Sequence, residues 1–79
     1  MIENTFRTKD LSVSAFLYAS GKKLIGLEED NGKYWFVFED KERCEELVNS
    51  YWRKEATVVA KEYADSIQSL KTLIFNKER

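Results

Sequence analysis

The chain has 79 residues, 13 basic and 14 acidic for a net charge of −1, and 43% of the residues are hydrophobic. This length suits one small domain, and the balanced charge with ample hydrophobic content excludes a disordered chain or a basic polyanion-binding tail. The absence of histidine and the single cysteine, Cys44, exclude histidine-based catalysis, internal disulfides and multi-cysteine metal sites. We therefore expect one α+β domain over residues 1–79.

The start of the chain predicts a strand and a helix. Residues 4–8 contain the alternating, β-prone segment Thr-Phe-Arg-Thr. Asp10 suits a helix N-cap, because its carboxylate can accept hydrogen bonds from free N–H groups of the next turn. We expect a helix over residues 11–20, ended by Gly21, which can adopt the positive φ angle of a helix terminus.

Asn31-Gly32 predicts a tight hairpin between residues 24–29 and 34–39, since both turn positions of a type I′ turn take positive φ angles. The expected cross-strand pairs are Glu29 with Tyr34, Leu27 with Phe36, and Ile25 with Phe38. Strand alternation then gives a core face of Ile25, Leu27, Phe36 and Phe38. The opposite face carries Leu24, Gly26, Glu28, Trp35 and Val37.

The second half of the chain predicts helices. Asp40 is the expected N-cap of a helix whose apolar residues recur at helical spacing, namely Cys44, Leu47, Val48, Tyr51 and Trp52. A single helix over residues 41–76 would be roughly 54 Å long, about twice the width of a compact domain of this size. We therefore expect a break at residues 55–57, with Thr57 capping a third helix. The alternative is a continuous helix that pairs with a second subunit.

The expected order of elements is strand, helix, strand, strand, helix, helix. This order predicts an α+β fold with a small three-stranded sheet and helices packed on one of its faces. A right-handed crossover through the first helix sets the first two strands parallel, and the hairpin makes the third strand antiparallel to the second.

The sequence favours no catalytic residue, metal, cofactor or small-molecule substrate. Cys44 lies near a helix start, where a thiolate is favoured, but it falls on the apolar stripe and is expected to be a core thiol. The acidic residues lack the spacing of a calcium loop. The segment Gly21-Lys22-Lys23 lacks the first glycine and the hydroxyl of a phosphate-binding loop.

No signal peptide or membrane-spanning run is visible in the sequence. The first residues, Met1–Thr5, lack a basic start followed by an apolar segment, and no apolar run approaches the length of about 20 residues that a membrane helix needs. We expect a cytoplasmic location without membrane contact, in which Cys44 stays reduced.

Two binding functions are consistent with this composition. The first is self-association or binding of a protein partner, because so few helices leave one sheet face uncovered; its candidate contacts are Leu24, Trp35 and Val37. The second is binding of single-stranded or duplex DNA, with basic side chains on phosphates and an aromatic ring on the bases. Its candidate residues are Arg7, Lys9, Lys22, Lys23 and Trp35. The pI of about 5.5 makes it the less favoured function.

Four short motifs resemble a known family. They are Phe6-x-Thr8-x-Asp10-Leu11, Ala15-Phe16-Leu17, Trp35-Phe36-x-Phe38 and Cys44-x-x-Leu47-x-x-x-Tyr51. Together they resemble a family of small bacterial and phage proteins catalogued as a domain of unknown function, and the resemblance extends from Asn4 to about Phe75. It implies a stand-alone domain, often encoded in phage or mobile DNA, and assigns no activity, ligand or site residue.

Overall fold

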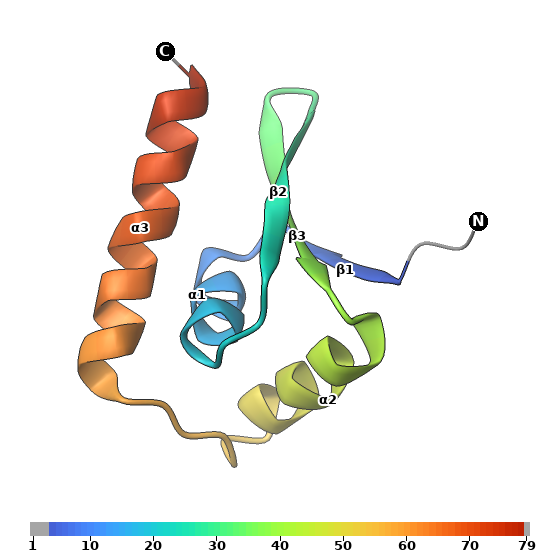
Figure 1. Ribbon diagram of the computed structural model, residues 1–79, viewed down its shortest axis with the longest axis vertical. Coiled ribbons are helices and arrows are strands. Elements are labelled where there is room, and N and C mark those ends of the chain that lie inside the picture. The colour runs from blue at the N-terminus through green and yellow to red at the C-terminus, as the bar shows by residue number, and fades with distance from the viewer. Residues whose placement is uncertain (1–3, 79) are drawn as a thin grey trace.

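The structure is a computed structural model that describes residues 4–78. Its elements, in chain order, are β1 (Thr5–Thr8), α1 (Leu11–Ala19), β2 (Leu24–Asp30), β3 (Lys33–Glu39), α2 (Lys41–Trp52) and α3 (Ala60–Glu78). Figure 1 shows a small sheet with α1 beside it, α3 beyond α1, and α2 below. The α+β fold and the order of elements are as the sequence predicts.

The sheet has the order β1-β3-β2, so the last strand of the chain lies in the middle. Strand β3 is antiparallel to both neighbours. Strands β1 and β2 therefore run parallel, as the expected crossover through α1 requires, but β3 separates them. Because β3 has a partner on each side, its side chains form the centre of both sheet faces.

Helix α1 begins and ends through local chemistry. The Asp10 carboxylate accepts hydrogen bonds from the Ser12 hydroxyl at 2.7 Å and the Val13 backbone N–H at 3.1 Å. These two bonds lower the pKa of Asp10 from its ordinary value. At the other end, Gly21 has a φ of 93° and its N–H donates to the Tyr18 carbonyl oxygen, which confirms the predicted helix end.

The hairpin confirms the predicted turn. Asn31 and Gly32 have φ angles of 54° and 81°, as a two-residue type I′ turn requires. Glu29 pairs with Tyr34, and Leu27 pairs with Phe36, both as expected. The turn thus sets the register correctly over the half of the hairpin nearest to it.

The predicted register is wrong further from the turn. A bulge between Leu24 and Gly26 makes Leu24, and not Ile25, the partner of Phe38. An extra residue in one strand turns the following side chains to the other face. Leu24 therefore packs against the core, whereas Ile25 is 52% exposed. Each of the two residues therefore lies on the face opposite to the one that strict alternation predicts.

One buried cluster joins all three helices to the sheet. Its members are Val13, Ala15, Phe16, Leu17, Phe36, Phe38, Cys44 and Leu70. Five consecutive residues of α1, Val13–Leu17, are buried, because neighbouring elements surround this helix. Strand β3 contributes Phe36 and Phe38 to the cluster. The helices therefore pack on the face of the sheet that carries these two phenylalanines.

The expected break between the last two helices is confirmed, and the continuous-helix alternative is wrong. Helix α2 ends at Trp52, where the N–H groups of Lys54 and Glu55 donate to carbonyl oxygens of its last turns. Thr57 is not the cap that the sequence suggests, since α3 begins at Ala60. The connecting segment stays irregular because Ala56 and Val58 pack against the core. Among residues 4–78, no helix has the length and apolar character to span a membrane.

Candidate functional site

The sheet has a second face, here called the open face, on the side away from the buried cluster. In Figure 1 the helices lie to the left of the hairpin and below it. The register places on the open face Thr5 and Arg7 of β1, Lys33, Trp35, Val37 and Glu39 of β3, and Gly26, Glu28 and Asp30 of β2. This face is therefore lined mainly by polar and charged side chains around a single tryptophan.

Trp35 lies at the centre of the open face between two cations. The Arg7 guanidinium is 4.9 Å from the centroid of the indole ring, and the Lys9 ammonium is 4.7 Å from it. At these distances the ring quadrupole attracts both positive charges. The strand pairing explains the cluster, because Arg7 lies beside Val37 and the chain then passes Trp35 on its way to α1.

The indole N–H of Trp35 is covered and has no hydrogen-bond acceptor among the described residues. A covered hydrogen-bond donor without an acceptor lowers the stability of the fold by about 1–3 kcal/mol. Unfavourable features of this kind are found most often at functional sites. The side chains of Arg7 and Lys9 lie over the ring and supply part of the cover. Trp35 as a whole is half-buried.

The charges of the open face meet over its central strand. Arg7 belongs to β1 and Lys9 follows it in the chain, but the charged ends of both lie over Trp35, whereas Glu28 and Asp30 belong to β2. The Arg7 guanidinium reaches across β3 to the Glu28 carboxylate at 2.8 Å. Glu28 and Asp30 are not recognisable as site residues from the sequence, because their relation to Arg7 depends on β3 lying between the two outer strands.

The predicted apolar patch of Leu24, Trp35 and Val37 does not form. Leu24 is turned toward the core by the bulge. Val37 is on the open face but only 6% exposed, because Arg7 on the neighbouring strand and Trp35 on its own strand flank it. Of the three predicted protein contacts, Trp35 and Val37 share the open face, where Val37 is nearly covered and Trp35 is half-buried.

The predicted nucleic-acid residues separate into two groups. Arg7, Lys9 and Trp35 come together, as described. Lys22 instead binds the Asp40 carboxylate at 3.1 Å, and Lys23 lies 3.9 Å from the Glu39 carboxylate. Glu39 is four residues along β3 from Trp35, a distance of roughly 13 Å along an extended strand. Both lysines therefore lie around the end of β3 that is remote from Trp35, and they do not join the cluster.

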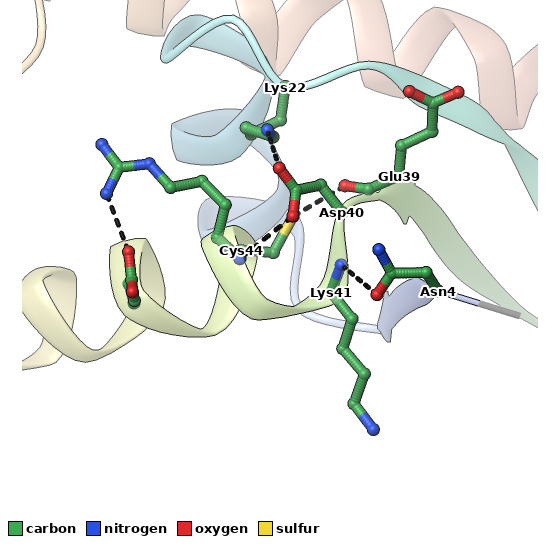
Figure 2. Close-up of polar contacts among 8 residues, drawn as sticks. Asn4, Lys22, Glu39, Asp40, Lys41 and Cys44 are labelled. Atoms are coloured by element: carbon green, nitrogen blue, oxygen red, sulfur yellow. Dashed lines mark hydrogen bonds and ion pairs between the residues drawn. The ribbon is translucent and has the colours of Figure 1, made fainter.

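The junction between β3 and α2 is built by Asp40 (Figure 2). Its carboxylate accepts hydrogen bonds from the Lys22 ammonium at 3.1 Å and from the Arg43 backbone N–H at 3.3 Å. The Lys22 bond, followed by that from Arg43, lowers the pKa of Asp40. Asp40 is confirmed as the N-cap of α2, although its φ of 70° is left-handed, a conformation that aspartate tolerates better than most residues.

Cys44 is a core thiol, as the sequence predicts. It is fully buried, and its thiol donates a hydrogen bond to the Glu39 carbonyl oxygen at 3.3 Å (Figure 2). Burial raises the pKa of Cys44, which disfavours the reactive thiolate. Across the described part of the chain, no group of three or more histidine, cysteine or acidic side chains is placed to hold a metal ion.

Residues 3–76 match a family described as "Domain of unknown function (DUF5659)". The match covers nearly the whole chain, so the chain belongs to this family. The resemblance to a domain of unknown function is thereby confirmed, while its bacterial or phage origin is not addressed by the match. No curated protein and no solved structure matches the chain.

Proposed function

We propose that this DUF5659 domain acts by binding and not by catalysis, and that it associates with a second copy of itself through the open face. The observation that carries the proposal is the position of Trp35, half-buried at the centre of a helix-free sheet face and flanked by Arg7 and Lys9. Tryptophan and arginine are the residue types that most often dominate the binding energy of protein interfaces.

A binding function also agrees with the chemistry of the chain. The sequence has no histidine to act as a general base. Its strongest nucleophile, Cys44, is fully buried, and its pKa is raised. A buried free thiol further supports our proposal of a cytoplasmic location, where thiols stay reduced.

A second copy is the partner that the charge pattern favours. The open face carries both cations and carboxylates, namely Arg7, Lys9 and Lys33 with Glu28 and Asp30, so two copies of it can contribute opposite charges to a two-fold contact. The area is modest, because three strands about 4.8 Å apart form a narrow surface. We therefore expect a contact below the standard size of about 800 Å² per partner, and a weak, reversible dimer.

Sedimentation equilibrium over a range of concentrations tests this proposal. We expect the wild-type mass to rise from 9.3 kDa toward that of a dimer at high micromolar concentration. Trp35→Ala should remain monomeric. Trp52→Ala is the matched control, since Trp52 is 61% exposed at the end of α2 and away from the open face. A wild-type chain that stays monomeric throughout, or a Trp35→Ala variant that dimerises equally well, overturns the proposal.

Nucleic-acid binding is the second candidate, favoured by the meeting of Arg7, Lys9 and Trp35 on one face. It predicts binding of single-stranded oligonucleotides at low salt, with affinity falling steeply as salt rises. Lys9→Ala should weaken this binding, whereas Lys22→Ala should not. It ranks second because Glu28 neutralises Arg7. No detectable binding at low salt eliminates it.

A further inference from the structure

We propose that self-association through the open face is strengthened by a dianionic oxyanion of the phosphate class, which binds between the Lys9 ammonium groups of the two copies. This ligand rests on the proposed function, because its site is formed only where two open faces meet. The charges that gather over Trp35 in one copy, and those that a second copy adds, lead to this assignment.

The centre of the open face carries two cations and one carboxylate. The Arg7 guanidinium and the Lys9 ammonium lie 4.9 Å and 4.7 Å from the centroid of the Trp35 ring. Arg7 is neutralised by Glu28, whose carboxylate is 2.8 Å away. Among residues 4–78, no carboxylate lies within 4.0 Å of the Lys9 ammonium. The positive charge of Lys9 is therefore left over beside the ring.

The other charges of the open face lie toward its two ends and have opposite charges beside them. Lys33 is the register partner of Asp30 next to the turn, so these two are cross-strand neighbours of opposite charge. At the remote end of β3, Lys23 lies 3.9 Å from the Glu39 carboxylate. Of the described cations around this face, Lys9 is thus the one with neither an ion pair nor an oppositely charged cross-strand neighbour.

A second copy doubles this unbalanced charge. Since the Lys9 ammonium lies over Trp35, a two-fold axis that passes close to Trp35 brings the two ammonium groups toward each other. This holds for any direction of the axis relative to the strands. Like charges that meet in a contact oppose association. A negative charge bound at this point therefore strengthens the contact.

The groups around Trp35 indicate the chemical class of the ligand. The indole N–H of Trp35 has no acceptor among the described residues, and a lysine ammonium has three donors and no acceptor. The cluster is therefore rich in hydrogen-bond donors and short of acceptors. A phosphate group carries a charge of about −1.5 to −2 near pH 7 and three acceptor oxygens. One such group can neutralise both Lys9 charges, whereas a chloride ion can neutralise only one.

Sedimentation equilibrium at constant ionic strength tests the ligand, with sodium chloride replaced stepwise by inorganic phosphate. One phosphate bound per dimer should tighten wild-type dimerisation about tenfold once its concentration is about ten times its dissociation constant. Lys9→Ala removes the unbalanced charge, so this variant should dimerise equally in chloride and phosphate. Lys71→Ala is the matched control, because Lys71 is exposed on α3 and away from the open face, and it should respond to phosphate as wild type does.

The Lys9→Ala variant also separates specific binding from a general effect of the salt. Phosphate strengthens apolar contacts because it is excluded from protein surfaces, and this effect would act equally on wild type and on Lys9→Ala. A phosphate response that survives in Lys9→Ala therefore overturns the proposal. The same titration with a nucleoside monophosphate shows whether the site takes the free ion or a phosphate ester, and a response to either supports it. Circular dichroism and thermal unfolding show that each variant is folded.

The outcomes separate this ligand from the proposed function. If wild type dimerises equally in chloride and phosphate while Trp35→Ala stays monomeric, the oxyanion is wrong and the open-face contact stands. If raising the chloride concentration tightens the dimer as much as phosphate does, screening alone explains the effect, and the oxyanion is again wrong. If wild type is monomeric in both salts at all concentrations, both proposals fail.

Discussion

The two faces of the sheet use aromatic residues from the same strand in different ways. Phe36 and Phe38 are 1% and 0% exposed, enclosed by apolar side chains of all three helices. Trp35, the residue before Phe36 and on the other face, is covered by the charged ends of Arg7 and Lys9. The first kind of burial stabilises the fold through close packing. The second kind can be exchanged for contacts with a partner, so we expect stability and binding to separate between the faces.

Phe38→Ala should have the largest effect on stability. It removes a fully buried ring from the centre of the core, at a cost of about 3–5 kcal/mol, which is enough to unfold a domain this small. The milder Phe38→Leu should cost less and leave a folded protein whose urea unfolding can be measured. Trp35→Ala is the comparison on the open face. If it destabilises the chain as much as Phe38→Ala does, the proposed separation between the faces fails.

Replacing the N-cap of α1 tests how much one polar contact contributes to stability on the side of the sheet that the helices cover. Asp10→Ala removes the acceptor of the Val13 N–H and should destabilise the protein by about 1 kcal/mol. Thermal unfolding measures the loss. Asp10→Asn keeps an oxygen acceptor and should retain most of the stability, so an equal loss in both variants would show that charge, and not capping, stabilises the helix start.

Replacement of Lys54 should change the free energy of unfolding by a smaller amount and in the opposite direction. It follows the C-cap of α2, Arg53, and has a left-handed φ of 62°, a conformation that glycine adopts without steric cost. We expect Lys54→Gly to raise the free energy of unfolding by about 0.5–1 kcal/mol, with self-association unchanged. Gly21→Ala, at a φ of 93°, should do the reverse. A destabilised Lys54→Gly protein would indicate that the lysine side chain has an unrecognised role.

Acidification should change the stability of the protein most gradually. The pKa values of Asp10 and Asp40 are lowered below their ordinary value of 3.8 in the folded chain. Their contribution to stability is therefore complete above the ordinary value and is lost as the pH falls through the lower, folded-state values. Urea midpoints measured from pH 7 to pH 3 should fall at the acid end, with a shallower fall for Asp10→Asn. A protein that gains stability toward pH 3 contradicts these shifts.

Sequence reasoning found the features that depend on local chemistry. The Asn31-Gly32 turn and the caps Asp10 and Asp40 follow from residue type and spacing alone. It failed at Leu24 and Ile25, since a bulge changes which face a residue occupies without an unambiguous local signal. It also missed the relation of Arg7 to Glu28, which requires pairing between segments far apart in the chain.

The indole N–H resonance of Trp35 tests the central claim most directly. Spectra of the ¹⁵N-labelled protein contain two such signals, from Trp35 on the open face and from the exposed Trp52, which serves as an internal control. On dilution from high to low micromolar concentration, we expect the Trp35 signal to shift and the Trp52 signal to stay in place. A shift of Trp52 alone, or constant positions for both signals, would contradict self-association through the open face.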